Sequence, residues 1–332
     1  MVNIKEKRYC AGERSNLKEI LPLKFPLSLS VEASSLCNFR CNYCSNSNIK
    51  KKSGNNFLSL KDFAKIVDNI VLSGYKLKAL NLARLGEPLL NKELPEIIEY
   101  AKRSNAFEKI LMITNGSLLG QNINKKLINA GLDKIVVSIQ GLTALKYFEV
   151  SKAKIDFDML IGNISNLYHN RSNCKIHIKA FRESLDGDID GFYKIFESIC
   201  DELSLEHVVP YMVDVDYKKL NCDNNKNRYG DNVRKTDVCP LPFYTMSILS
   251  NGDVSCCCVN NHDSLLIGSI HEKSLLEIWN SEKMKLFRKI QISGQREKHP
   301  ICGKCNFPVY GIQESDNLDD MDAAIKCHYL AV

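Results

Sequence analysis

The chain has 332 residues, of which 44% are hydrophobic and 25% are charged, and its formal net charge at pH 7 is +6. These values are typical of a globular protein with about two domains, and no apolar run approaches the ~18 residues that a membrane span needs. The basic residues are scattered, so we expect no nucleic-acid partner. The polar residues 1–19 are unlike a secretion signal, so we expect a cytoplasmic protein with no membrane partner.

Short apolar runs alternate with segments of helical periodicity over residues 27–217. We expect strands at residues 29–33, 79–83, 109–114, 134–139, 175–180 and 205–209. We expect helices within residues 60–71, 94–101, 123–128, 157–167 and 189–199. This alternation predicts an α/β fold with a parallel sheet and right-handed crossovers. A full eight-unit barrel needs ~250 residues, so a partial (β/α)6 barrel of TIM type fits better, with an open doubly wound sheet as the alternative.

The chain changes character after this stretch. Residues 1–26 form an N-terminal segment, residues 218–236 read as a polar linker or surface loop, and residues 237–332 form a small α+β extension. Within the extension, Asn251-Gly252 is a strong signal for a two-residue hairpin turn. A following helix is expected to bury one apolar face, made of Leu275, Ile278, Trp279, Leu286 and Phe287.

Three cysteines follow the first expected strand in a Cys-x3-Cys-x2-Cys spacing: Cys37, Cys41 and Cys44. Fourteen cysteines in a chain without a secretion signal favour metal or cluster ligation over a disulfide scaffold. Three thiolates are one fewer than usually close an iron–sulfur cluster, so one iron would stay open to another ligand. A zinc knuckle would need a fourth Cys or His close by, and the next candidates, His169 and Cys174, are far away in the sequence.

This spacing, with the aromatic Tyr43 before the last cysteine, resembles the cluster motif of radical S-adenosylmethionine (radical SAM) enzymes. The resemblance implies a partial barrel that binds a 4Fe–4S cluster through Cys37, Cys41 and Cys44, with SAM on the open iron. It also implies that a flavodoxin or ferredoxin reduces the cluster. SAM is then split into methionine and a 5′-deoxyadenosyl radical, which takes a hydrogen atom from the substrate.

Further residues match the family at the ends of expected strands. Gly86-Glu87-Pro88 resembles the Gly-Gly-Glu motif that receives the methionine ammonium of SAM, with Leu85 in place of the first glycine; the alternative is a turn with a solvated Glu. The resemblance implies four further candidate cofactor contacts: Tyr43 near the adenine, Asn115, Ser138 and Gln140. Of these, Asn115 could touch either the cofactor or the substrate. Lys179 and Arg182 are candidate catalytic residues, either for the methionine carboxylate or for deprotonating a substrate radical.

A second cysteine set occupies the extension: Cys239, Cys257, Cys302 and Cys305. Zinc would accept the same four thiolates, but the arrangement resembles the SPASM and shorter twitch extensions of radical SAM enzymes. Gly311 stands where that family has its next cysteine, so the resemblance implies one auxiliary 4Fe–4S cluster. Alternation along a strand would turn Cys256 and Cys258 away from the cluster and leave Cys257 facing it. Cys327 is an alternative ligand.

These expectations combine into a radical SAM oxidoreductase acting on a small molecule, such as a sugar, aminocyclitol or nucleotide-sugar. An auxiliary cluster that accepts an electron makes net oxidation feasible, for example dehydrogenation of a carbinol. About thirty residues precede the cysteine loop, fewer than the leader-binding domain of peptide-modifying relatives requires, and residues 192–210 resemble relatives from bacterial carbohydrate loci. The alternatives are a peptide- or protein-modifying maturase (epimerisation, thioether formation or Ser/Cys oxidation) and a non-enzymatic cluster- or zinc-binding module.

Overall fold

The computed structural model of the chain describes residues 14–47, 56–220 and 222–331. Within these residues the strands form one nine-stranded sheet in the order β6-β5-β4-β3-β2-β1-β7-β8-β9. The strands are β1 (Ser28–Val31), β2 (Leu77–Leu82), β3 (Phe107–Thr114), β4 (Lys134–Ile139), β5 (Lys175–Phe181), β6 (Glu202–Glu206), β7 (Thr245–Ile248), β8 (Asp253–Ser255) and β9 (Leu266–Ser269). Pairing is parallel from β6 through β1 to β7, and antiparallel from β7 to β9.

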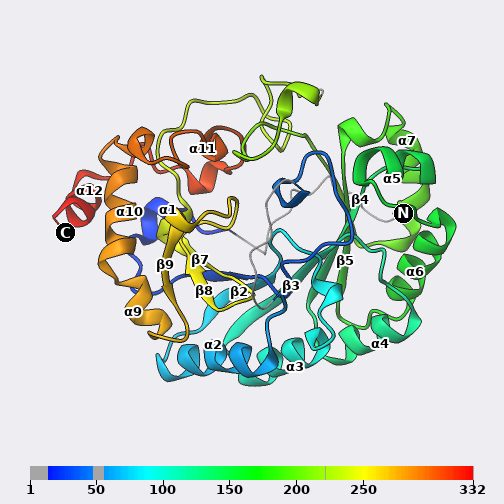
Figure 1. Cartoon of the computed structure of the whole chain (residues 1–332), viewed down its shortest axis with the longest axis horizontal. Helices are drawn as coiled ribbons and strands as arrows, with labels where there is room; N and C mark the ends of the chain where they lie inside the picture. The colour runs from blue at the N-terminus through cyan, green and yellow to red at the C-terminus, as the bar shows by residue number, and fades with distance from the viewer. Residues whose placement is uncertain (1–13, 48–55, 221, 332) are drawn as a thin grey trace.

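Helices follow the outer side of the curved sheet, as Figure 1 shows. They are α2 (Leu60–Leu72), α3 (Leu94–Ser104), α4 (Gln121–Asn129), α5 (Ala144–Ser151), α6 (Phe157–His169) and α7 (Ile189–Phe196). The sheet does not close, because β6 and β9 form its two edges. The expected α/β partial barrel is therefore confirmed, while a doubly wound sheet would carry helices on both faces.

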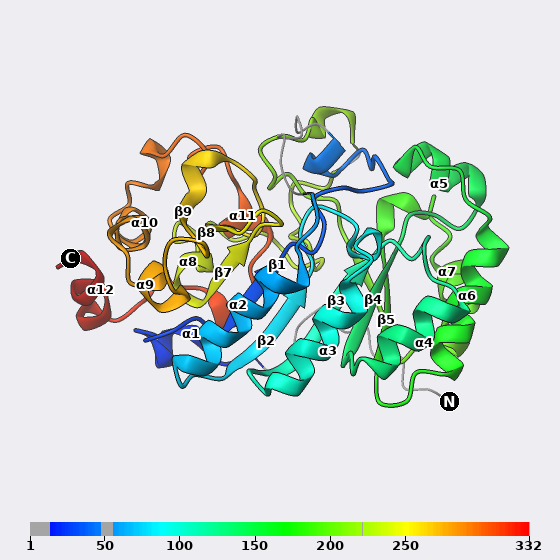
Figure 2. The ribbon, with the colours of Figure 1, turned by 60° about the horizontal axis from the view of Figure 1, so that its bottom comes forward.

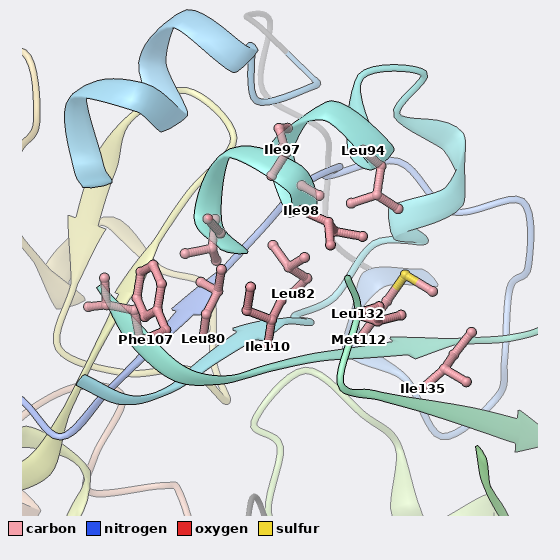
Figure 3. Packing of buried hydrophobic residues seen from close by; sticks show 14 of the residues in the cluster. Leu80, Leu82, Leu94, Ile97, Ile98, Phe107, Ile110, Met112, Leu132 and Ile135 are labelled. Carbon is pink, nitrogen blue, oxygen red and sulfur yellow. The ribbon is translucent and has the colours of Figure 1, made fainter. Parts of the chain in front are cut away.

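The outer face of the sheet is apolar because alternate strand residues point toward the helices. Figure 3 shows Leu80 of β2 and Ile110 of β3 facing Ile97 and Ile98 of α3. Each of these side chains is at most 1% exposed. Helix α2 begins where Ser59 accepts a hydrogen bond from the Asp62 amide (3.1 Å), as expected for an N-cap. Burial of these apolar side chains between the sheet and the helices accounts for the helical and strand periodicities of the sequence.

The inner face carries polar side chains at the carboxyl end of the sheet. Ser138 on β4 lies opposite Lys179 on β5, which lies opposite Ser204 on β6. One step further along, Phe181 lies opposite Glu206. The alternating Glu and Ser residues of β6 hide its pattern, so this strand begins and ends three residues earlier than predicted, at Glu202–Glu206 instead of 205–209.

The extension joins the barrel through the sheet itself, because β7 pairs with β1. A turn at Asn251-Gly252 connects β7 and β8, but it is longer than the expected two residues. The Leu249 amide donates to the Asp253 carbonyl oxygen (2.8 Å), so the loop holds residues 250–252, with Gly252 at a φ of +87°. The remaining helices are α1 (Leu17–Ile20), α8 (Leu241–Tyr244), α9 (Leu275–Trp279), α10 (Glu282–Ile292), α11 (Phe307–Tyr310) and α12 (Ala323–Leu330). Figure 2 shows the extension, with helices α8 to α12, beside the barrel helices. The domain boundaries near residues 26, 217 and 237 stay predictions, and residues 1–13 of the N-terminal segment lie outside the described residues.

One prediction for the extension is wrong. The single helix expected to bury Leu275 through Phe287 is two helices, α9 and α10, because Ser281 caps a new helix by accepting from the Met284 amide (3.3 Å). The change of direction leaves Leu286 56% exposed. No helix among the described residues combines the length and apolarity that crossing a bilayer requires.

Candidate functional site

The first cysteine set lies in the loop after β1, at the carboxyl edge of the sheet. Burial raises the pKa of the Cys41 thiol, and repulsion from Cys44 and Cys37 adds to this increase. Burial also raises the pKa of Cys44 to about 11. The three sulfurs are thus close enough to disfavour one another's charge. A cluster bound to these thiols would reverse this, because a coordinating thiol loses its proton, so the donor set fits a cluster.

The cysteine loop is anchored to helix α5. The amides of Arg40 and Asn42 donate to the carbonyl oxygens of Ser151 (2.7 Å) and Val150 (3.0 Å) at the end of that helix. Within the loop, Arg40 Nη1 donates to the Cys37 carbonyl oxygen at 2.7 Å. These contacts fix the backbone that presents the sulfurs.

Glu87 joins the loop to the neighbouring strand ends. Its amide donates to the Leu36 carbonyl oxygen (2.7 Å), while its carboxylate accepts from Thr114 Oγ1 (2.7 Å) and the Asn115 amide (2.8 Å). Glu87 is 2% exposed, and burial raises its pKa to about 7 against the effect of these hydrogen bonds. Asn115 Nδ2 also donates to Asn38 Oδ1 in the loop (2.8 Å). The structure therefore brings Glu87, Gly86 and Asn115 to the loop, and their contacts with SAM stay predictions.

The second cysteine set lines one small apolar cavity of about 30 Å³ in the extension. Its lining includes Cys239, Cys257, Cys302 and Cys305. The Cys257 sulfur accepts from the amides of Val259 and Asn260 (both 3.4 Å), and the Cys305 sulfur accepts from Asn260 Nδ2 (3.3 Å). Donors aimed at sulfur stabilise a thiolate and tune an iron–sulfur cluster. These residues fit an auxiliary cluster.

Among the residues that the structure describes, no three His, Cys, Asp or Glu side chains are grouped so as to hold one metal ion.

Cys257 does not line the cavity alone among its neighbours, and its assignment as the cluster ligand stays a prediction. Cys256 lines the same cavity and is 3% exposed. Strand β8 ends at Ser255, and its register with β9 shifts between Val254 and Ser255, so strict alternation does not extend to the cysteines. Cys327 is exposed on α12 and is not among the residues that line the cavity.

Two family signatures cover these regions. The signature of the Radical SAM superfamily matches residues 31–195, and that of the SPASM iron–sulfur cluster-binding domain matches residues 239–306. The chain belongs to the radical SAM superfamily and carries a SPASM domain. The family implies a 4Fe–4S cluster with SAM, and the SPASM domain implies auxiliary iron–sulfur binding.

Similar proteins differ in what they act on. A GTP 3′,8-cyclase of Psychromonas ingrahamii is 28% identical over 162 residues, which are 49% of this chain and 47% of the cyclase. The chain thus spans about half the length of the curated relatives it matches. Among solved structures, BtrN in complex with AdoMet and 2-DOIA has a TM-score of 0.58 at 17% identity, covering 90% of this chain and 97% of BtrN. Streptococcus suis SuiB bound to its precursor peptide SuiA has a TM-score of 0.62 at 16% identity, covering 90% and 78%. At these identities the two likenesses show the fold.

The predicted SAM contacts of this radical SAM enzyme gather around the loop. Gln140 Oε1 is 3.9 Å from Cys41 Sγ, and its Nε2 donates to the Ser138 carbonyl oxygen (2.9 Å). The Tyr43 ring meets Phe181 edge-on, with centroids 4.6 Å apart. Gln140 therefore lies beside Cys41 and Ser138, and Tyr43 packs against Phe181, while the roles of Tyr43, Ser138 and Gln140 stay predictions.

A buried charge cluster lies at the ends of β5 and β6. Lys179 Nζ and Arg228 Nη2 contact the same Glu206 oxygen, at 2.9 Å and 2.7 Å. Burial alone would raise the pKa of Glu206, but Arg228 and Lys179 lower it to about 2. Within the described residues, Glu206 Oε1 and Arg228 Nε have no hydrogen-bond partner. Two cations around one carboxylate leave an excess positive charge at this edge.

The two predicted catalytic residues lie in different places. Lys179 is 7% exposed on the inner face. Arg182 begins a 3₁₀ turn after β5 has ended and is half-buried.

Arg228 is the residue that sequence reasoning missed. It comes from residues 218–236, read as a polar linker, and its partner Glu206 is on the last barrel strand. A polar stretch carries no local signal for such a distant contact.

Proposed function

We propose that this radical SAM enzyme oxidises a small polar molecule, with the auxiliary cluster as electron acceptor. A sugar, aminocyclitol or nucleotide-sugar with a carbinol group is the substrate class, and dehydrogenation to a ketone is the reaction. A flavodoxin or ferredoxin is the proposed reductant of the first cluster.

The observation that carries this proposal is the link that Tyr211 makes between the auxiliary cysteine set and the buried charge cluster. Its carbonyl oxygen is 3.3 Å from Cys305 Sγ, and its hydroxyl accepts from Arg228 Nη1 (3.3 Å). On the side of the first set, Lys179 Nζ lies 6.0 Å from the centroid of the Phe181 ring, and that ring packs against Tyr43 of the cysteine loop with centroids 4.6 Å apart. The Lys179–Glu206–Arg228 cluster therefore adjoins both sets, which supports a substrate that gives hydrogen on one side and an electron on the other.

Each residue set has a proposed role. When bound, SAM at the first cluster supplies a radical that takes a hydrogen atom, and the auxiliary cluster supplies a one-electron acceptor. Cys37, Cys41 and Cys44 would hold the first cluster, and Cys239, Cys257, Cys302 and Cys305 the second. The proposed SAM-orienting residues are Tyr43, Gly86, Glu87, Asn115, Ser138 and Gln140.

Lys179 and Arg228 are proposed to act on the substrate oxygen. Oxidation of a carbinol removes a hydrogen atom from carbon, a proton from the hydroxyl group and one electron. Negative charge develops on the oxygen as the hydroxyl proton leaves for water. Two fixed cations in a site of low dielectric stabilise that charge without reorganising.

Modification of a peptide is the competing activity, and the likeness in fold to SuiB is the reason to test it. The charge cluster argues for a small substrate, because Lys179 is 7% and Glu206 2% exposed. Such enclosure suits a compact polar molecule better than an extended chain. Family membership leaves no support for a purely zinc-binding module.

Anaerobic reconstitution tests the proposal. We expect about eight irons per chain and formation of 5′-deoxyadenosine from SAM and dithionite. A panel of aminocyclitols, nucleotide-sugars and Ser- or Cys-containing peptides is then screened for products that have lost two hydrogens. Turnover of peptides alone would refute the small-molecule proposal. Cys41→Ala should abolish SAM cleavage, whereas Cys305→Ala should retain part of it and lose the oxidised product.

A further inference from the structure

Arg84 follows strand β2 and reaches across the end of β1 to the extension. Its side chain is fully buried. Nε donates to Ser247 Oγ on β7 (2.8 Å), and Nη1 donates to Glu32 Oε2 after β1 (3.2 Å). Nη2 donates to the carbonyl oxygens of Asn260 (3.2 Å) and Cys257 (3.5 Å). One guanidinium thus binds the barrel, strand β7 and the turn that begins at a predicted auxiliary ligand.

The turn of residues 257–260 supplies hydrogen-bond donors to two of the sulfurs. Its amides at Val259 and Asn260 donate to the Cys257 sulfur, and the Asn260 side chain donates to the Cys305 sulfur. By binding two carbonyl oxygens of this turn, Arg84 holds the donors that point at two predicted ligands. Groups that support metal ligands in this way tune both affinity and potential.

The buried ion pair between Arg84 and Glu32 has a definite orientation relative to the auxiliary site. Glu32 Oε1 accepts from the amide and hydroxyl of Ser250 (both 3.3 Å), in the hairpin turn between β7 and β8. The Arg84 guanidinium instead contacts the ligand turn. A buried ion pair adds little net stability compared with apolar packing, so we look to its orientation for a role. Its orientation places the positive end toward the auxiliary site.

We propose that Arg84 is a positioning residue that raises the reduction potential of the auxiliary cluster and fixes the turn that carries one of its ligands, Cys257. Reduction adds one electron and no proton, so the cluster becomes one unit more negative. A fixed positive charge in a medium of low dielectric favours that reduced form. The source of the electron, a substrate radical, rests on the proposed function; the effect of Arg84 on potential does not.

The test is an anaerobic redox titration followed by electron paramagnetic resonance on the full reconstituted chain, with Cys41→Ala included so that the auxiliary signal stands alone. Arg84→Gln should lower the potential relative to the parent. Glu32→Gln, which leaves Arg84 uncompensated, should raise it. Arg84→Lys, which keeps the charge, should stay nearer the parent than Arg84→Gln. Loss of packing alone would not shift the reduction potential in opposite directions for the Arg84→Gln and Glu32→Gln variants.

A matched control is Arg171→Gln, because Arg171 forms a bidentate pair with Asp201 (3.0 and 3.1 Å) on another part of the barrel. It should leave the potential unchanged. If Arg84→Gln fails to fold, the double variant Glu32→Gln/Arg84→Gln removes both charges and should titrate below Glu32→Gln. Equal potentials, or shifts of the same sign for Arg84→Gln and Glu32→Gln, overturn the proposal. Opposite shifts in potential in a protein that oxidises no small molecule would support the role of Arg84 and refute only the proposed function.

Discussion

Gly86 lies directly against the backbone of Ser34: a Cβ atom on Gly86 would come within 1.8 Å of the Ser34 carbonyl oxygen. The same atom would lie 2.8 Å from the Leu36 carbonyl oxygen. Both oxygens belong to the segment that leads into the cysteine loop. The glycine of the Gly-Glu-Pro sequence is therefore required by close backbone packing between β2 and this loop, independently of any contact with SAM.

Gly86→Ala should displace the cysteine loop. The collision is with backbone, which cannot rotate away, so we expect a loss of about 3 kcal/mol in the free energy of unfolding. We also expect iron content to fall toward that of the auxiliary site alone. Iron analysis and thermal denaturation of the reconstituted protein measure both effects.

Gly162→Ala in helix α6 is the control for this substitution. A Cβ at Gly162 would meet no atom within 4 Å, so alanine there should stabilise the protein by about 0.5–1 kcal/mol. Full iron content in Gly86→Ala would contradict the steric argument.

Local patterns in the sequence predict much of the fold. Strand β4 occupies Lys134–Ile139 as expected, and Ser59 caps α2. Both follow from short-range rules, namely alternation and capping. Strand β6 was misplaced because its inner-face residues Glu202 and Glu206 break the apolar run, and their partners come from other parts of the chain.

The site was predictable only where residue spacing marks it in the sequence. The cysteine spacings identify both thiol sets, but Arg84 and Arg228 have no pattern around them. Each is defined by a contact with a residue distant in the chain, Cys257 and Glu206 respectively. These pairs come together only in the folded chain, and no local sequence signal marks them.

Glu87 should make stability depend on pH. Burial raises its pKa from 4.5 to about 7, so the folded state holds the proton more tightly than the unfolded state. The stability that this contributes is complete below about pH 4.5 and is lost as pH rises to about 7, a change of about 3 kcal/mol. Glu87→Gln removes the titration. Relative to the variant, the wild type should therefore lose several degrees of thermal midpoint between pH 5 and pH 8, measured anaerobically without SAM. A difference that stays constant over this range would show that Glu87 does not titrate there.

The identity of the fourth auxiliary ligand can be read from iron content. The Cys257 sulfur accepts two amide hydrogen bonds, whereas Cys256 is buried within the apolar core. Cys257→Ala should therefore lower iron from about eight to about four per chain, while Cys256→Ala should keep about eight. The reverse pattern would assign Cys256 as the ligand. Cys327→Ala, on the exposed face of α12, serves as a further control and should retain all the iron.

Lys179→Met should uncouple SAM cleavage from product formation. Lys179 Nζ is held at 2.9 Å from Glu206 on the inner face, where we place the substrate oxygen. Removing one of two cations that stabilise charge in the transition state should lower the rate of product formation roughly 10²-fold or more, while 5′-deoxyadenosine still forms from SAM and dithionite. Lys175→Met is the matched control, since Lys175 begins the same strand at its opposite, exposed end and should leave turnover unchanged. Equal product formation by the two variants, in an assay that follows 5′-deoxyadenosine and product together, would remove Lys179 from the proposed reaction.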